Sequence, residues 1–152
     1  MAKTRVKQAA ARPTRTGTTV RLTVDQAVIA VLIAAMDANQ HVSREEAWRA
    51  HHLIWSMRRF RNQPGEKVDR LTDTVRARME TLGKPAVLQA AARTLPAQLR
   101  QPVFAAAIDL MLVDTRLERS EKDFVAELAT ALKVPSKLAG EILRVLLIKN
   151  AA

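Results

Sequence analysis

Residues 23–38 read TVDQAVIAVLIAAMDA, and this stretch decides the fold class. Its apolar side chains, Val28 and Val31 among them, recur every three or four residues, which is the period of a helix face. Thr23 opens the stretch and Gln26 follows three residues later, a spacing that lets each side chain accept a backbone N–H in a capping box. The stretch therefore predicts a helix that begins directly after Thr23.

The helical period continues through the rest of the chain. Breaks fall at Pro64–Gly65, Gly83 and Pro96, where helices are expected to end or begin. With 4 Gly, 6 Pro, 3 Phe and no Tyr in 152 residues, the chain is short of the turn and aromatic residues of a β-sandwich or barrel. We therefore predict an all-α, single-domain bundle of about seven helices over residues 23–150. The later helices are expected at about 44–60, 66–82, 85–95, 102–113, 119–132 and 136–147.

The composition excludes several classes of chemistry. The chain has no cysteine, which removes disulfides, thiolate zinc sites, iron–sulfur clusters and cysteine nucleophiles. It has no phosphate-binding glycine loop and no Gly-x-Ser-x-Gly turn, and its three histidines lack the His-Glu-x-x-His spacing of a metal site. No apolar run reaches the roughly 18 residues that span a bilayer. We therefore predict a cytoplasmic protein that is not an enzyme.

Residues 1–22 are predicted to be a disordered basic tail. The segment has no Asp or Glu and few large apolar side chains, so it buries too little surface to offset the entropy of ordering. One possibility is that the segment is an electrostatic arm, which binds an anionic partner through its cations. The other is that it is a solvated, disordered segment that binds nothing specific. As an arm, together with the cluster Arg58–Arg61, it would make the chain a nucleic-acid or anionic-surface binding accessory protein. Its six cations, in a chain of net charge +10, are Lys3, Arg5, Lys7, Arg12, Arg15 and Arg21.

An internal repeat relates the two halves of the chain. Residues 28–60 and 103–135 align without a gap at a shift of 75 residues. Each stretch consists of an apolar helix, a short polar loop and a helix opened by an acidic residue, so we predict a two-fold repeat of a helical hairpin. Identical pairs are Val28/Val103, Ala30/Ala105, Ile33/Ile108, Met36/Met111, Arg44/Arg119, Glu46/Glu121 and Leu53/Leu128.

The loops of the two hairpins share a further pattern. They read ANQHVSREE at residues 38–46 and VDTRLERSE at residues 113–121. Here the chain resembles the TerB-like family, small helical domains named for tellurite resistance, whose loop is Ala-Asp-Gly-x-apolar-polar-x-x-Glu. The resemblance covers about residues 24–149. It implies a bacterial stress-response module without enzymatic activity that binds a divalent cation, protein partners or both.

The second loop carries the oxygen ligands that Ca²⁺ or Mg²⁺ prefers. Asp114, Glu118 and Glu121 occupy one loop and the first turn of the following helix. Asn39 and Glu46 hold the related positions in the first loop, where Asn replaces the family's Asp and keeps an oxygen but loses the charge. These five residues are the candidate metal ligands. The alternative is that the acids cap helix N-termini, where negative side chains are favourable.

The helix expected at residues 44–60 carries both tryptophans of the chain. Alignment of the repeat places its core positions on one side, and the tryptophans lie on the other side at 100° per residue. Tryptophan beside arginine is typical of interface hot spots, so this stripe is a candidate surface for a protein partner. The alternative is that a neighbouring helix covers the stripe. Its members are Trp48, His52, Trp55 and Arg59.

Overall fold

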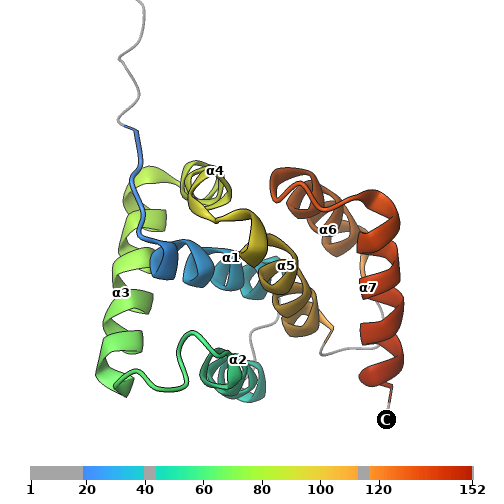
Figure 1. The fold of residues 1–152 in the computed structure, drawn as a ribbon, viewed down its shortest axis with the longest axis horizontal. Helices are drawn as coiled ribbons and strands as arrows, with labels where there is room; N and C mark the ends of the chain where they lie inside the picture. Colours follow the sequence, from blue (N-terminus) through green and yellow to red (C-terminus); the bar gives the residue numbers. More distant parts are fainter. Residues whose placement is uncertain (1–18, 40–43, 113–116, 152) are drawn as a thin grey trace, which may run out of the picture.

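The computed structural model describes residues 19–39, 44–112 and 117–151. Within these ranges there are no strands, and seven helices pack as one bundle (Figure 1), which confirms the predicted all-α class. Among the helices in the described part of the chain, none has both the length and the apolar character that crossing a membrane requires. The helices are α1 (Val24–Ala38), α2 (Arg44–Ser56), α3 (Gly65–Leu82), α4 (Lys84–Thr94), α5 (Ala97–Met111), α6 (Arg119–Ala131) and α7 (Ser136–Lys149).

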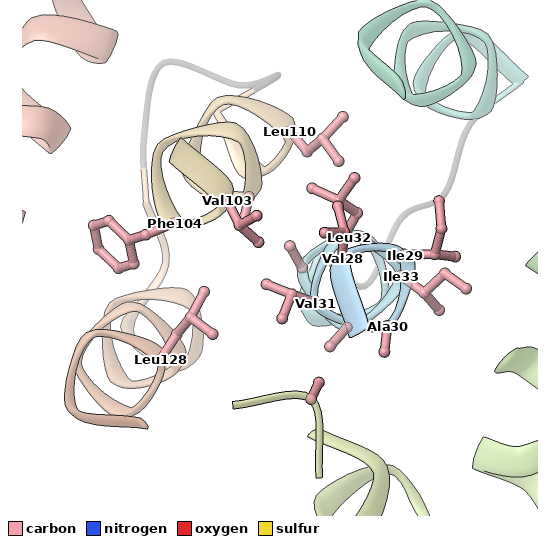
Figure 2. Packing of buried hydrophobic residues seen from close by; sticks show 14 of the residues in the cluster. Val28, Ile29, Ala30, Val31, Leu32, Ile33, Val103, Phe104, Leu110 and Leu128 are labelled. Carbon is pink, nitrogen blue, oxygen red and sulfur yellow. The ribbon is translucent and has the colours of Figure 1, made fainter. Parts of the chain in front are cut away.

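Helix α1 is the centre of the bundle. Helices α3, α4 and α5 pack around it most extensively, and α2 and α6 also touch it (Figure 1). Figure 2 shows its side chains pointing to several sides, with Val31 toward α5 and α6 and Ile29 away from them. The sequence pattern indicated one apolar face, but the structure buries the whole circumference from Ala27 to Ala35. A helix that is apolar on all sides is stable in water only when other helices enclose it.

The N-terminus of α1 is fixed by the predicted capping box. The N–H of Thr23 donates to Oε1 of Gln26 at 3.0 Å, and the N–H of Gln26 donates to Oγ1 of Thr23 at 3.2 Å. These bonds satisfy backbone donors that have no partner inside the helix. A cap of this kind typically stabilises a protein by about 1 kcal/mol.

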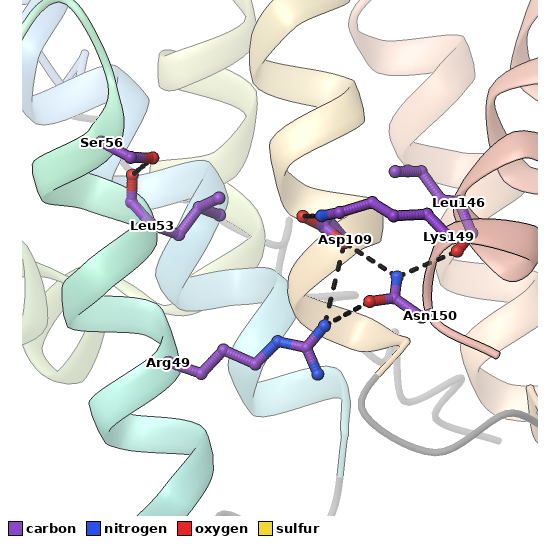
Figure 3. Close-up of polar contacts among 7 residues, drawn as sticks. All are labelled: Arg49, Leu53, Ser56, Asp109, Leu146, Lys149 and Asn150. Atoms are coloured by element: carbon purple, nitrogen blue, oxygen red, sulfur yellow. Dashed lines mark hydrogen bonds and ion pairs between the residues drawn. The ribbon is translucent and has the colours of Figure 1, made fainter. Parts of the chain in front are cut away.

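Helix α2 ends at Ser56, earlier than the sequence pattern predicted. The hydroxyl of Ser56 donates to the carbonyl of Leu53 at 2.8 Å (Figure 3). The N–H of Met57 is shared between the carbonyls of Leu53 and Ile54, each at 3.2 Å, and tight turns follow. These turns bring Phe60 into the core, where it is 0% exposed. The burial of this ring favours ending the helix over continuing it.

Helix α5 begins at Ala97, before the predicted start near Pro102, which therefore lies inside the helix. A proline there lacks the N–H that an interior helical residue donates. The cost is offset because the next two residues, Val103 and Phe104, are both 0% exposed. Packing of α5 against α1 thus decides the path of the backbone at this proline.

Helices α2 and α6 have corresponding bounds in the two halves of the chain. Each bound of α6 lies 75 residues after that of α2, the shift found in the sequence. Helix α2 packs against α5, and α6 packs against α1. The structural equivalence of the two hairpins stays a prediction.

The packed chain begins before α1. Val20 and Leu22, which fall within the expected tail, are half-buried and pack against the core. A guanidinium N–H of Arg78 on α3 also donates to the backbone carbonyl of Arg21. Residues 20–22 therefore belong to the packed body.

This packing leads to a prediction for truncated chains. Removing residues 1–18 should change the melting temperature by less than about 2 °C, because the sequence predicts that the tail buries little surface. Removing residues 1–22 should cost about 1–2 kcal/mol more, because two half-buried apolar side chains are lost. Far-UV circular dichroism during heating measures both. A large loss on removing only residues 1–18 would show that the tail packs on the body.

Candidate functional site

Helix α2 exposes a tryptophan on its outer side. Ala50 and Ile54 face the core and are 3% and 9% exposed, whereas Trp48 is 67% exposed. The centroid of the Trp48 indole lies 3.9 Å from that of the His52 imidazole, one helical turn later. Arg44, one turn before Trp48, is also exposed. We call Arg44, Trp48 and His52 the Trp48 face.

Trp55 has a different environment from Trp48, although both belong to the predicted stripe. Its ring is half-buried and packs against the core. The start of α3 covers it, since a Cβ placed on Gly65 would lie 3.4 Å from Cζ2 of Trp55. Its buried Nε1 has no hydrogen-bond partner among the described residues. The structure therefore divides the stripe into an exposed part at Trp48 and a covered part at Trp55.

Arg59, the last residue of the predicted stripe, joins two parts of the bundle. Its side chain pairs with Asp25 in the first turn of α1. Its backbone carbonyl accepts a hydrogen bond from Nε2 of Gln63 at 2.9 Å. Nearby, Arg58 and Arg61 are exposed and form no ion pair with any residue in the described ranges. Arg59 thus stabilises the fold, while its two neighbours leave positive charge at the surface.

The acidic residues that begin α6 cap the helix. Glu118 is the N-cap residue, and its N–H donates to Oε2 of Glu121 at 2.6 Å as half of a capping box. Glu121 is 6% exposed, so its carboxylate is directed to its own helix terminus. Within residues 19–39, 44–112 and 117–151, no group of three or more His, Asp or Glu residues is arranged to hold a metal ion. Among the described residues, Glu118 and Glu121 thus act as helix caps.

The remaining candidate ligands do not complete such a site in the described part of the chain. Asn39 is the C-cap residue of α1. Asp114 and the side chain of Glu46 lie outside the described residues, as do tail residues Lys3, Arg5, Lys7, Arg12 and Arg15. The Ca²⁺ or Mg²⁺ site stays a prediction.

Substitution of Glu121 separates capping from cation binding. Glu121→Ala should lower the free energy of unfolding by about 1 kcal/mol through loss of the cap, and Glu121→Gln should cost less because an amide oxygen still accepts the N–H. Millimolar Ca²⁺ or Mg²⁺ should shift the wild-type melting temperature by less than about 1 °C. A rise of several degrees that is lost in Asp114→Asn/Glu121→Gln would instead establish a cation site.

A polar cluster that the sequence analysis did not identify joins α2, α5 and α7 (Figure 3). Asp109 on α5 is 9% exposed. Its carboxylate accepts hydrogen bonds from Nζ of Lys149 at 2.6 Å and Nδ2 of Asn150 at 2.9 Å, and Nη2 of Arg49 lies 4.0 Å away. Arg49 also donates to Oδ1 of Asn150. We call these four residues the Asp109 cluster.

The cluster holds Asp109 in its charged form. Burial alone would raise the pKa of Asp109, but the hydrogen bonds from Asn150 and Lys149 and the charges of Lys149 and Arg49 outweigh burial, so the pKa is lowered. The sequence signal was an aspartate within the apolar run VFAAAIDLML of residues 103–112. A charge there requires partners from elsewhere in the fold.

A cavity of about 450 Å³ lies among α1, α4 and α6. Leu88 and Phe124 contribute to its apolar lining. At its edge, Nζ of Lys84 lies 2.5 Å from a carboxylate oxygen of Asp37, so these two charges neutralise each other. The cavity thus offers a largely apolar lining and no activated nucleophile.

One protein family matches this chain. The family model described as "Tellurite resistance protein TerB" covers residues 25–142, from the first turn of α1 to the middle of α7. No curated protein and no solved structure matches the chain.

Proposed function

Because this chain belongs to the TerB tellurite resistance family, we propose that it is a non-enzymatic, tellurite-resistance-type module that binds an acidic segment of a protein partner through α2. The match over residues 25–142 confirms the resemblance that the two loops predicted. Family membership supports the type of module. The mode of binding rests on the chemistry of the Trp48 face.

The observation that carries the proposal is the exposure of Trp48, at 67%. An indole is a large apolar group, and tryptophan is among the residues that most often dominate binding energy at protein interfaces. Its contact with His52 limits the positions that the ring can take. A preorganised side chain loses less conformational entropy when a partner docks.

Exposed arginines on α2 and in the turns that follow it support an acidic partner. Arg44 on α2 and Arg58 and Arg61 in the following turns are exposed and have no ion-pair partner in the parts of the chain that the structure describes. Such cations attract and orient an oppositely charged partner. We therefore expect a segment with carboxylates for the arginines and an apolar side chain for the indole.

A capture experiment tests this function. Immobilised wild-type protein should retain a partner with an acidic segment, Trp48→Ala should retain much less of it, and raising the salt concentration should weaken capture. Leu82→Ala, at an exposed apolar residue at the end of α3, is the matched control and should behave as wild type. Equal capture by Trp48→Ala and wild type would refute the proposed surface.

The basic tail supports a second candidate function, in nucleic-acid or anionic-surface binding, because its six cations are accompanied by no acid. If the tail binds DNA, a gel shift should weaken steeply with salt, with a log–log slope of up to about −5 for six phosphate contacts. Removing residues 1–18, which carry five of the six cations, should remove most of that binding, while Trp48→Ala should preserve it. The two variants thus distinguish tail binding from α2 binding.

A further inference from the structure

Helix α7 is held to the bundle differently from α1. Of its described residues only Ala139 is buried, and five other apolar residues are half-buried against the core. Val145 and Ile148 are 56% and 67% exposed. Helix α7 packs mainly on α5 and α6, whereas α1 is enclosed by five helices. The apolar contribution to holding α7 in place is therefore smaller than that of the packing around α1.

The C-terminal end of α7 is fastened by the Asp109 cluster. Lys149 is the last residue of α7, and Asn150 is its C-cap. Both donate to the carboxylate of Asp109 on α5, and Asn150 also accepts from Arg49 on α2 (Figure 3). Charged hydrogen bonds to a buried carboxylate are stronger than exposed ion pairs. This end of α7 thus depends on polar contacts.

The other end of α7 is joined to α6 by a tight turn. Lys133 lies in this turn with φ of 56°, the one positive φ at a non-glycine residue within the described ranges. Its N–H donates to the carbonyl of Thr130 at 3.1 Å, and the N–H of Val134 donates to the carbonyl of Ala129 at 2.8 Å. A turn closed by its own hydrogen bonds persists when the helix beyond it moves, so it can act as a pivot.

We propose that α7 is a latch, which opens as a unit about this turn and is held closed at its C-terminal end by the Asp109 cluster. Opening breaks the contacts of Asp109 with Lys149 and Asn150 and separates Arg49 from Asn150. It also uncovers apolar surface on α5 and α6, against which α7 packs. Proteins open locally in such cooperative units when few apolar contacts hold a segment.

The latch is connected to the Trp48 face, and this step rests on the proposed function. Arg49 directly follows Trp48 on α2, and its side chain is 39% exposed. A carboxylate of a partner docked beside Trp48 competes with Asp109 and Asn150 for this guanidinium. Docking and latch opening therefore favour each other, and the coupling is reciprocal.

Amide hydrogen exchange of the full chain, without a partner, tests the latch. A helix of 14 residues is only marginally stable in water without packing, so α7 loses amide protection once it detaches. In the wild type, amides of α7 after residue 142 should therefore exchange faster than those of α1. Asp109→Asn should accelerate exchange in α7 by about 10- to 100-fold. The other helices should keep the same ranking by exchange rate as in the wild type. Lys149→Met removes one donor and should accelerate exchange in α7 less. Asp37→Asn is the matched control, because Asp37 pairs with Lys84 away from α7, and it should leave exchange in α7 unchanged.

Two results would overturn the latch. The first is that the amides of α7 exchange no faster than those of α1. The second is that neither Asp109→Asn nor Lys149→Met changes the exchange rate of α7. If Asp109→Asn does not fold, Lys149→Met decides, since its lysine side chain is 58% exposed and tolerates replacement. Coupling to docking is tested in the capture experiment: Asp109→Asn, which opens the latch, should retain more of the partner than wild type, and equal retention would refute the coupling. If α2 captures no partner while exchange in α7 behaves as expected, the proposed function is refuted but the latch proposal is not.

Discussion

Replacing Asp109 with alanine is expected to lower the free energy of unfolding by about 2–3 kcal/mol. The substitution removes a carboxylate that is 9% exposed together with its two hydrogen bonds, so Lys149 loses its acceptor. Asn150 keeps its bond to the carbonyl of Leu146, and Arg49 keeps its bond to Asn150. Because Lys149 and Arg49 reach solvent, the loss is smaller than for a fully enclosed ion pair. Urea denaturation measures the change.

The control for this prediction is Asp37→Ala, which should cost less than about 1 kcal/mol, because the side chains of its partners Arg76 and Lys84 are largely exposed. Equal losses at Asp37 and Asp109 would show that burial of the cluster adds nothing to stability.

The cluster also predicts how stability depends on pH. The pKa of Asp109 is lower in the folded chain than the ordinary value of 3.8, so the unfolded chain binds more protons in acid. The stabilisation that charged Asp109 gives is complete when the pH is above the ordinary pKa. It is lost as the pH falls through the lower pKa of the folded chain. Arg49 on α2 and Lys149 on α7 are the charged groups that face Asp109. The stability difference between wild type and Asp109→Asn should therefore shrink in this acidic range, as denaturation at a series of pH values would show.

Trp48→Ala is expected to weaken partner binding by about 30-fold or more, the loss typical of an interface hot spot, while changing stability by less than about 0.5 kcal/mol. Trp55→Ala should cost about 2–3 kcal/mol of stability, because that ring packs between the core and the start of α3. Tryptophan emission tests the assignment independently in two variants that each keep one tryptophan. In Trp55→Phe, the remaining Trp48 should emit at a wavelength near that of free indole. In Trp48→Phe, the remaining Trp55 should emit at a shorter wavelength. Reversed stability effects of the two alanine variants would contradict the assignment.

The central helix could be predicted from sequence because its signals are local. Thr23 and Gln26 lie three residues apart, and their reciprocal bonds depend only on the first turn of α1. The end of α2 could not be predicted in this way, because it depends on where Phe60 enters the core. Tertiary packing decides a helix boundary whenever burial of one large side chain outweighs a few helical hydrogen bonds.

The candidate sites follow the same rule. The spacing of Glu118 and Glu121 fits either metal ligands or helix caps. The structure shows the two residues in a capping box, and the cation site stays a prediction. The two tryptophans share a stripe in sequence, but only contact with Gly65 on α3 separates a covered ring from an exposed one. The Asp109 cluster joins residues that are 40 to 101 positions apart. The residues that pair with Asp109 can be identified only when the positions of α2 and α7 beside α5 are known.

In the proposed function, α2 contacts a protein partner at Trp48. A photo-crosslinking amino acid placed at position 48 in cells tests it most directly, with position 82 at the exposed end of α3 as control. We expect position 48 to form a crosslink to one discrete protein through an acidic segment, and position 82 to form none. Crosslinks of equal yield at both positions, or crosslinks from position 48 only to nucleic acid, would contradict it.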